Sequence, residues 1–420
     1  MKRILHLLLA LLMASCAARN GDRQILYSTD EMPIVDMHTH LNGKEEFKQC
    51  VKTMDEWGGA LSITLNRNDG GLRQFIDDSL NGRILMAGRG KDLTAAEVQE
   101  VKDQGFVGIK AHLRYHTLPS QIPGEQIEKM GELNLPFIAM HVADPPEDHY
   151  YVPDKFMVHQ QDAERVIRRH PQTNFIMAHG FYLTNRDADI DTLRKFFDRN
   201  PNLYVDIACT KWWDAPQPTY AKIRKLLIDY KDRFLFGTDF KVHRSAPAFR
   251  FMREKLETDK PLTFGMNGGP GPGLALPLDV LNHIYYWNAA QIIPGVKEAL
   301  TRLGYEISDK PPASQPVVPP PDYNPPPITI LVHPDTTKLS DGVFKVVVDF
   351  VYDRRVNARL DVRNYKKKLV RTIFQGELSG KKSLQWDMRN EKGDKVEAGF
   401  YRLWLELDGN KSVESNFVLK

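Results

Sequence analysis

Short apolar segments alternate with amphipathic, charged segments between residues 33 and 304. The apolar segments, each of strand length, are 33–40, 59–66, 83–89, 106–113, 136–143, 174–180, 203–208 and 233–240. Strands that alternate with helices form a parallel sheet, and eight such units in about 270 residues are what a (β/α)8 TIM-type barrel requires. A doubly wound open sheet is the alternative. No Gly-x-Gly-x-x-Gly follows the first strand, which counts against dinucleotide binding.

The sequence changes character after the eighth unit. Residues 305–327 are dense in proline and predict a stiff linker. Residues 328–420 contain alternating segments such as FKVVVDFVY and YRLWLEL, separated by turn sequences, which predicts a small all-β sandwich. The segment that runs from Trp386 to Tyr401 resembles the immunoglobulin-like domain of flagellar hook-capping proteins. We expect these two aromatic residues to fill the core of the sandwich.

Length and charge bound the class of protein. The chain has 420 residues and a formal net charge of +3. This length predicts about two domains. The small net charge gives no indication of a nucleic-acid partner. The sequence leaves the oligomeric state open.

The first sixteen residues, MKRILHLLLALLMASC, have the pattern of an export signal. Lys2 and Arg3 precede an apolar segment that is too short to span a bilayer. Small residues then precede Cys16, and this resembles the lipobox of bacterial lipoproteins, in which the cysteine is lipidated. Residues 1–16 are therefore predicted to direct the protein to the cell envelope, where Cys16 would anchor it to the outer membrane, on a periplasmic or surface face. An ordinary cleaved secretory signal is the alternative.

Histidine and aspartate recur where the predicted barrel strands end. The first strand closes on His38 and His40, which share a face because alternate residues of a strand point the same way. The fifth strand ends with His141, the sixth with His179 and the eighth with Asp239. The C-terminal ends of barrel strands form one rim, where active sites lie. The five side chains are therefore predicted to converge, which favours a metal or catalytic site over unrelated polar residues.

The motifs MHTHL, HVAD, AHGF and FGTDF resemble, in this order, the amidohydrolase superfamily. They are most similar to its amidohydrolase-related branch, which contains metal-dependent hydrolases and non-oxidative decarboxylases, and the resemblance covers residues 33–295. It implies that one divalent metal is bound by His38, His40, His141 and Asp239. It also implies that His179 lies beside the metal-bound water or the substrate.

The chemistry of these residue types agrees with that implication. Imidazole and carboxylate ligands suit zinc, with manganese or iron as alternatives. A bound metal lowers the pKa of its water and polarises an acyl oxygen. Asp239 can accept a proton from the water, while His179 can stabilise charge or protonate a leaving group. Lys110 leaves the metal count open, because two-metal members of the superfamily often use a carboxylated lysine on the fourth strand. We expect one metal, with Lys110 near the substrate or supporting the site.

Three further residues are candidates for contacts around the site. His112 lies two residues after Lys110, on the same strand face, and is a candidate substrate contact. Asp206 points inward from the seventh strand, either as the partner of an imidazole or with a direct role. Arg244 follows the eighth strand, where it can pair with a substrate carboxylate or lie in solvent.

These features predict an exported, metal-dependent hydrolase that acts on an ester, lactone or amide bond of a small molecule. Non-oxidative decarboxylation is the alternative reaction, and it would need an arginine for the substrate carboxylate, for which Arg114 is the nearest candidate. A catalytically inactive, surface-binding lipoprotein is the alternative of another class. Retention of all five metal-site residue types argues against it. The sequence does not identify the substrate.

Overall fold

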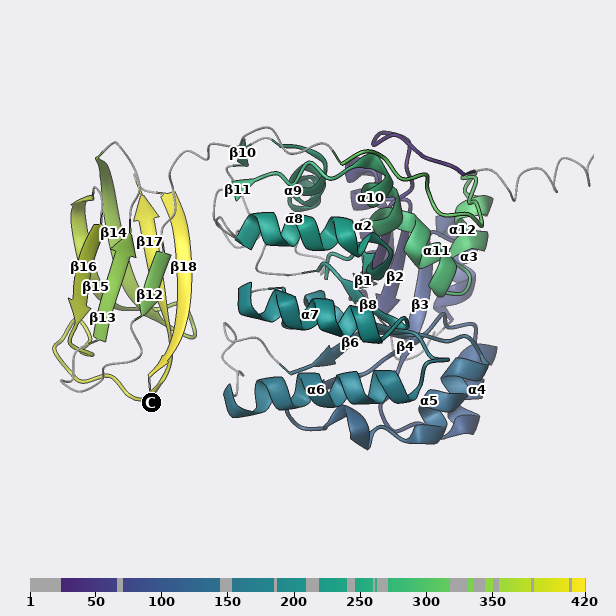
Figure 1. Ribbon diagram of the computed structural model, residues 1–420, viewed down its shortest axis with the longest axis horizontal. Coiled ribbons are helices and arrows are strands. Elements are labelled where there is room, and N and C mark those ends of the chain that lie inside the picture. Colours follow the sequence, from purple (N-terminus) through teal and green to yellow (C-terminus); the bar gives the residue numbers. More distant parts are fainter. Residues whose placement is uncertain are drawn as a thin grey trace, which may run out of the picture.

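A computed structural model describes residues 24–65, 71–143, 153–184, 187–208, 219–239, 246–259, 261–262, 271–317, 331–334, 344–349, 355–378, 381–407 and 410–419. Within these residues the chain forms a parallel, nearly closed barrel wrapped by helices, followed by a region of antiparallel strands (Figure 1). The predicted fold class, a TIM-type barrel followed by a small all-β sandwich, is confirmed.

The barrel strands are parallel and follow chain order around the sheet. They are β1 (Val35–Thr39), β2 (Leu61–Leu65), β3 (Ile84–Arg89), β4 (Ile109–Lys110), β5 (His112–Arg114), β6 (Phe137–Val142), β7 (Phe175–Met177), β8 (Leu203–Asp206) and β9 (Phe234–Leu235). They pair in the order β1-β2-β3-β4-β6-β7-β8-β9, and β5 pairs with β6. The backbone N–H of Met37 donates to the carbonyl of Phe236 at 3.0 Å, which joins the last strand segment to the first. The carboxyl ends of all strands therefore lie at one rim.

Helices surround the strands. They are α2 (Lys44–Trp57), α3 (Leu72–Leu80), α4 (Ala95–Asp103), α5 (Gly124–Glu132), α6 (Pro153–Arg169), α7 (Asp187–Arg199), α8 (Thr219–Asp229), α9 (Ala246–Glu257), α10 (Leu278–Asn282), α11 (Asn288–Ile292) and α12 (Val296–Arg302). Short turns of helix are η1 (Pro119–Gln121), η2 (Ala178–Tyr182), η4 (Lys231–Arg233) and η5 (His283–Trp287).

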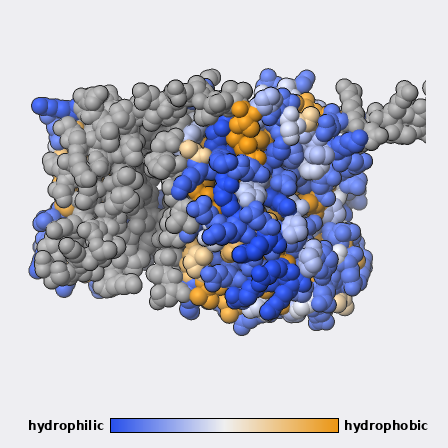
Figure 2. Space-filling model, viewed as in Figure 1, coloured by the Kyte–Doolittle hydropathy of each residue, from blue (hydrophilic) through white to orange (hydrophobic). Residues whose placement is uncertain are grey.

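Each helix buries its apolar side against the strands. Helix α2 buries Phe47, Met54 and Trp57, which recur at helical spacing. Helix α4 begins with a capping box, in which Thr94 and Glu97 bind each other's backbone N–H groups. On the face of the barrel that Figure 2 shows, the coloured surface is mostly hydrophilic. The barrel thus has one rim of strand ends available for a site, and its sides are covered.

The sixth predicted strand is shorter than the sequence indicated. Pairing stops at Met177, and His179 lies in the following turn, η2. The backbone of His179 has φ 59°, so it is not extended. The alternation of side chains along a strand therefore does not set the direction of His179, contrary to the basis of the prediction.

The eighth predicted strand is also short. Its pairing in β9 stops at Leu235, because the N–H of Phe236 donates to the carbonyl of Ile284 in η5 at 2.9 Å and not to a strand. Asp239 lies four residues beyond, with φ 54°. It still reaches the rim, but from a loop segment and not from a strand end.

The fourth predicted strand is interrupted at Ala111, between β4 and β5. Lys110 is buried and 5% exposed, whereas His112 is exposed and pairs in register with His141 of β6. The two side chains therefore have different environments, although the sequence placed them on one face. The break in the strand explains the difference.

The first part of the predicted linker contacts the barrel. The hydroxyl of Tyr27 and the backbone of Glu306 share two hydrogen bonds, of 2.8 and 3.1 Å. Ile307 is 8% exposed and packs in a barrel cluster, and Lys231 donates to Ser314 at 3.1 Å. The segment from residue 305 to Ser314 thus packs along the barrel and does not behave as a free spacer.

The C-terminal strands form two antiparallel sheets. One contains β12 (Leu331–Pro334), β13 (Phe344–Asp349) and β16 (Lys381–Trp386), and the other contains β14 (Val356–Asn364), β15 (Leu369–Leu378), β17 (Gly399–Leu407) and β18 (Asn410–Leu419). Trp386 of the first sheet is 1% exposed and its ring lies 5.7 Å, edge to face, from that of Tyr401 in the second. Both belong to one core cluster, which confirms the prediction that they fill the sandwich.

Two short elements complete the description: β10 (Pro261–Leu262) and β11 (Gly271–Pro272) pair with each other in an antiparallel manner. Across the described part of the chain, the structure contains no helix with the length and apolar character needed to cross a membrane.

Candidate active site

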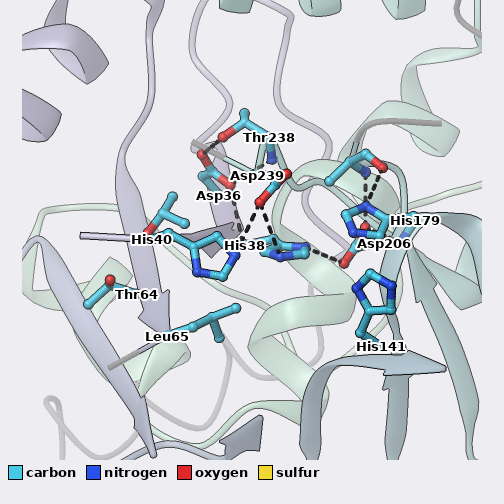
Figure 3. A network of polar contacts seen from close by, with 12 residues as sticks. Asp36, His38, His40, Thr64, Leu65, His141, His179, Asp206, Thr238 and Asp239 are labelled. Atoms are coloured by element: carbon cyan, nitrogen blue, oxygen red, sulfur yellow. Dashed lines mark hydrogen bonds and ion pairs between the residues drawn. The ribbon is translucent and has the colours of Figure 1, made fainter. Parts of the chain in front are cut away.

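The first strand and the residue after it position two imidazoles, those of His38 and His40, at the rim of the barrel. His38 is completely buried, and its Nδ1 lies 2.8 Å from Oδ2 of Asp206 (Figure 3). Because a carboxylate accepts hydrogen bonds, Nδ1 of His38 carries the proton in this contact. Nε2 then offers a lone pair toward the rim, as a metal-ligating imidazole must.

Asp239 faces both His38 and His40. Its Oδ1 lies 3.1 Å from Nε2 of His40 and 3.6 Å from Nε2 of His38. The three ligand atoms of this group all lie within 4.8 Å of one another. Two imidazole nitrogens and one carboxylate oxygen form a donor set that suits zinc, manganese or iron. These residues therefore fit a divalent metal.

The region of Asp239 is held against the first strand by buried polar contacts. Asp36 accepts from the N–H of Thr238 at 3.0 Å and from its hydroxyl at 2.5 Å. Burial raises the pKa of Asp36 to about 7, although these hydrogen bonds oppose the shift. Gly237 lets the two segments approach closely, since a Cβ at this position would lie 3.0 Å from Cβ of His38. Asp36 was not singled out in the sequence, but it lies two residues before His38 and shares its strand face.

His40 has a second contact that affects its protonation. A guanidinium nitrogen of Arg89, at the end of β3, lies 3.2 Å from Nδ1 of His40. Because a guanidinium only donates, Nδ1 of His40 accepts, and Nε2 carries the proton that faces Asp239. Ligation of a metal by Nε2 therefore requires the proton to move to Nδ1 and the Arg89 contact to open.

Asp206 organises the second half of the site. Besides His38, it accepts from the backbone N–H of His179 at 2.9 Å and of Ala208 at 3.0 Å. His38, His179 and Asp206 form a second group whose ligand atoms lie within 4.8 Å of one another. The side chain of Asp206 is thus the partner of an imidazole, one of the two roles that the sequence left open.

His179 is aimed into the site by an unusual turn. Residues 179–182 all have positive φ, between 54° and 61°, and three of them are not glycine. A residue with a Cβ in this region costs about 1–2 kcal/mol, and such strain concentrates at functional sites. Nδ1 of His179 donates to the carbonyl of Ala208 at 2.9 Å, so Nε2 bears the lone pair. Burial lowers the pKa of His179 to about 4, and the imidazole is neutral at pH 7.

His141 approaches the group from the side of His179 (Figure 3). The two rings are 5.4 Å apart, and Nε2 of His141 lies 3.2 Å from the hydroxyl of Tyr182. Burial and neighbouring positive groups hold the pKa of His141 well below its usual value. Among the described residues, neither ring nitrogen of His141 belongs to a group of ligand atoms that all lie within 4.8 Å of one another. Ligation of a metal by His141 therefore stays a prediction.

Tyr182 was missed by the sequence reasoning. It follows His179 by three residues, and nothing in the strand pattern pointed to it, because the turn that brings it back is left-handed. Its ring lies 5.1 Å from that of His179 and 5.4 Å from that of His141. Tyr182 thus links the two histidines.

The remaining predicted residues lie as follows. Lys110 is buried, and burial lowers its pKa to about 8 while Asp206 and Asp239 oppose the shift. The ring of His112 lies 4.5 Å from that of His141. Asp239 is ionised at pH 7: burial raises its pKa, but the hydrogen bond from His40 and nearby imidazoles outweigh burial and hold the pKa far below its usual value. Arg244 and Cys16 lie outside the described residues.

Comparison with known proteins identifies the family of the barrel. The sequence profile of the amidohydrolase family matches residues 77–294, which is more than half of the chain. The match includes His141, His179 and Asp239 and begins after His38 and His40. The chain therefore belongs to the amidohydrolase family, and the protein is an enzyme of the amidohydrolase-related type.

Several solved structures are similar to this chain. A probable 2-pyrone-4,6-dicarboxylic acid hydrolase from Acinetobacter baumannii, with citric acid bound, is 11% identical, with 62% of this chain and 98% of that chain covered and a TM-score of 0.44. An amidohydrolase from Bifidobacterium longum subsp. infantis is 13% identical, with 53% and 91% covered and a TM-score of 0.39. Dihydroorotase from Saccharomyces cerevisiae, in complex with 5-fluoroorotic acid, is 13% identical, with 85% and 97% covered and a TM-score of 0.37. No curated protein matches the chain.

Proposed function

We propose that the enzyme is a metal-dependent hydrolase that cleaves an ester, lactone or amide bond of a small molecule. The observation that carries the proposal is the position of Asp239, whose Oδ1 faces Nε2 of His40 at 3.1 Å and Nε2 of His38 at 3.6 Å. This places a carboxylate and two imidazoles around one point at the rim. Neutral His179 belongs to the adjoining group of ligand atoms, with His38 and Asp206.

His38, His40 and Asp239 would hold one divalent metal, with zinc preferred over manganese or iron, and His141 is the fourth predicted ligand. When bound, the metal would supply Lewis acidity toward a water molecule and an acyl oxygen. Buried Lys110 could instead bridge a second metal if it were carboxylated. We favour one metal, with Lys110 near the substrate or supporting the site.

Asp239 and His179 take different roles in proton transfer. Asp239 is ionised and can accept the proton that an attacking water loses. His179 carries a lone pair on Nε2, because Nδ1 donates to the carbonyl of Ala208. It must therefore gain a proton before it can give one to a leaving group. Asp206 holds the imidazole of His38 and the backbone of His179 in place for these steps.

A substrate panel tests the reaction type. Metal-loaded protein is assayed against esters, lactones, amides and aromatic acids, beside an Asp239→Asn variant that leaves the side chain almost unchanged in size. We expect addition of water across an acyl bond in the wild type and a loss of turnover of about 100-fold or more in the variant. Release of carbon dioxide from an aromatic acid, without cleavage of an acyl bond, would replace the hydrolase with a decarboxylase.

We also propose that the enzyme is a lipoprotein of the bacterial cell envelope, with an immunoglobulin-like C-terminal domain. The support is the sequence from Lys2 to Cys16 and the resemblance of the segment from Trp386 to Tyr401 to the domain of hook-capping proteins. Labelling of cells with radioactive palmitate is the test. The label should enter the wild type and be absent from Cys16→Ser; equal labelling of both would disprove the anchor.

A further inference from the structure

The turn that carries His179 is held in an unfavourable conformation. Residues 179–182 all have positive φ, and three of the four have a Cβ. Such a conformation disfavours residues with a Cβ, so it persists only where surrounding contacts fix it. The residues at the two ends of the turn, His179 and Tyr182, both belong to the candidate site, and their rings lie 5.1 Å apart. A contact that fixes the turn therefore fixes both side chains.

The two ends of the turn have partners within the site. The backbone N–H of His179 donates to Asp206 at 2.9 Å, and its ring donates to the carbonyl of Ala208 at 2.9 Å. At the other end, the hydroxyl of Tyr182 lies 3.2 Å from Nε2 of His141. These contacts join the turn to β6 and to the end of β8.

The middle of the turn is bound from a surrounding helix. Nε2 of Gln160, on α6, donates to the backbone carbonyl of Phe181 at 3.0 Å. Gln160 is 0% exposed and Phe181 is 1% exposed, so this hydrogen bond is shielded from water. Because a carbonyl only accepts hydrogen bonds, the nitrogen of the amide, and not its oxygen, must face Phe181. The bond thus joins the turn to the helical layer.

Packing alone does not explain a glutamine at this position. Its neighbours on the same face of α6 are apolar and buried: Phe156, Ala163 and Ile167. Among the residues that the structure describes, Oε1 of Gln160 is buried and has no hydrogen-bond partner. An unpaired buried acceptor destabilises a protein, and an apolar side chain of the same size would avoid this cost. What glutamine adds here is the donor to Phe181.

We propose that Gln160 is a positioning residue for the reaction. By binding the carbonyl of Phe181 it keeps the turn left-handed, and so it sets the direction of the His179 imidazole and of the Tyr182 hydroxyl. The inference rests on the proposed hydrolase function, in which His179 handles a proton. Without this hydrogen bond the turn can relax toward more favourable backbone angles, and the lone pair on Nε2 of His179 loses its fixed direction.

A kinetic comparison tests the positioning role on an ester that the wild type cleaves. Gln160→Met removes the donor and keeps the length and helix propensity of the side chain. We expect kcat to fall about 10- to 100-fold and KM to change by less than about threefold, because proton transfer depends on His179 more than substrate binding does. Gln161→Met, at the next and exposed glutamine of α6, is the matched control and should leave both values unchanged.

A second variant covers a failure of Gln160→Met to fold, which circular dichroism detects. Gln160→Asn keeps the amide but is one methylene shorter, so its nitrogen does not reach Phe181 from the same helix. The same loss of kcat is expected. A kcat in the folded Gln160 variant equal to that of Gln161→Met would overturn the inference.

Ring nitrogen-15 NMR of the full-length protein, labelled at histidine, separates the inference from the proposed function. In the wild type at pH 7 the proton of neutral His179 lies on Nδ1, so the two ring nitrogens should give well-separated signals, which His179→Asn identifies by their loss. In Gln160→Met these two signals should move toward each other, as the proton exchanges between the nitrogens, and in Gln161→Met they should not. If no ester is cleaved but the signals change in this way, the hydrolase proposal fails and the positioning role stands. Unchanged His179 signals in Gln160→Met would overturn it.

Discussion

Nδ1 of His38 lies 2.8 Å from Oδ2 of Asp206, and both side chains are completely buried. The contact fixes the proton of His38 on Nδ1. It also joins β1 to β8, which are the first and seventh strands predicted from the sequence. Asp206 also accepts from the backbone N–H of His179. One carboxylate therefore orients the imidazole of His38 and holds the backbone at His179.

Replacement of Asp206 should weaken metal binding without removing a ligand. In Asp206→Asn an amide nitrogen that faces His38 would donate to Nδ1, which forces the proton onto Nε2, the nitrogen that faces the metal position. We expect zinc affinity to fall about 10- to 100-fold, as measured by competition with a chromogenic chelator. Asp191→Asn, an exposed aspartate on α7, should leave the affinity unchanged. An unchanged affinity in Asp206→Asn would contradict the role given to this contact.

Replacement of Arg89 should have the opposite effect. The guanidinium of Arg89 holds Nδ1 of His40 as an acceptor and adds a positive charge near the metal position. Both effects oppose ligation by Nε2, so Arg89→Met should bind zinc several-fold more tightly, on the order of 1 kcal/mol. The same chelator competition measures it. Weaker binding in Arg89→Met would show that Arg89 supports the metal site.

The pH dependence of the free energy of unfolding should show that buried His179 is neutral in the folded protein. Its pKa is about 4 in the folded protein and 6.5 in the unfolded chain, so the unfolded chain binds an additional proton between these values. This contribution to stability is present above pH 6.5 and is lost as the pH falls to about 4, by up to about 3 kcal/mol. Buried Asp36, with a pKa of about 7, has the opposite sign over pH 4–7.

The comparison with His179→Asn isolates this contribution, because the amide can keep the hydrogen bond to Ala208 but does not titrate. Urea unfolding of the metal-free proteins between pH 4 and pH 7 is the measurement. The stability of the wild type should rise with pH more steeply than that of His179→Asn. Parallel curves would mean that the pKa of His179 is the same in the folded and the unfolded protein, which would contradict the shift.

The two cores should unfold independently. The cluster around Trp386 contains only C-terminal residues, whereas the barrel clusters extend no further than Ile307. We therefore expect deletion of residues 318–420 to leave turnover within about twofold of the full chain, because the cut spares the contact between Lys231 and Ser314. Deletion from residue 306 onward, which removes Ile307, should destabilise the barrel. Loss of activity in the shorter deletion would assign a catalytic role to the sandwich.

Strand periodicity was sufficient to predict the barrel and to place His38 and His40 together, although β1 ends at Thr39, one residue before His40, and its pairing with β2 shifts register between Asp36 and Thr39. It was not sufficient for His179 and Asp239, which lie beyond the paired residues and have positive φ. Their positions depend on the left-handed turn at 179–182 and on the contacts between Asp36 and Thr238, which are tertiary features. The alternation of side chains along a strand, which pointed to His38, could also have identified Asp36.

Residues that face the site from irregular backbone were the hardest to predict. Tyr182 reaches His141 only because three non-glycine residues adopt a left-handed conformation, which is uncommon and has no simple sequence signature. The sequence analysis named Arg114 only as the nearest arginine for the substrate carboxylate of a decarboxylase. The break at Ala111 and the pairing of β5 with β6 bring it beside His112 and the histidine cluster.

Metal content measured together with turnover tests the central claim most directly. Purified wild-type protein should contain about one equivalent of divalent metal, lose its activity when the metal is removed by a chelator and regain it with added zinc. The double variant His38→Ala with His40→Ala should retain neither metal nor activity while remaining folded by circular dichroism. A metal-free wild type with full activity would contradict the account.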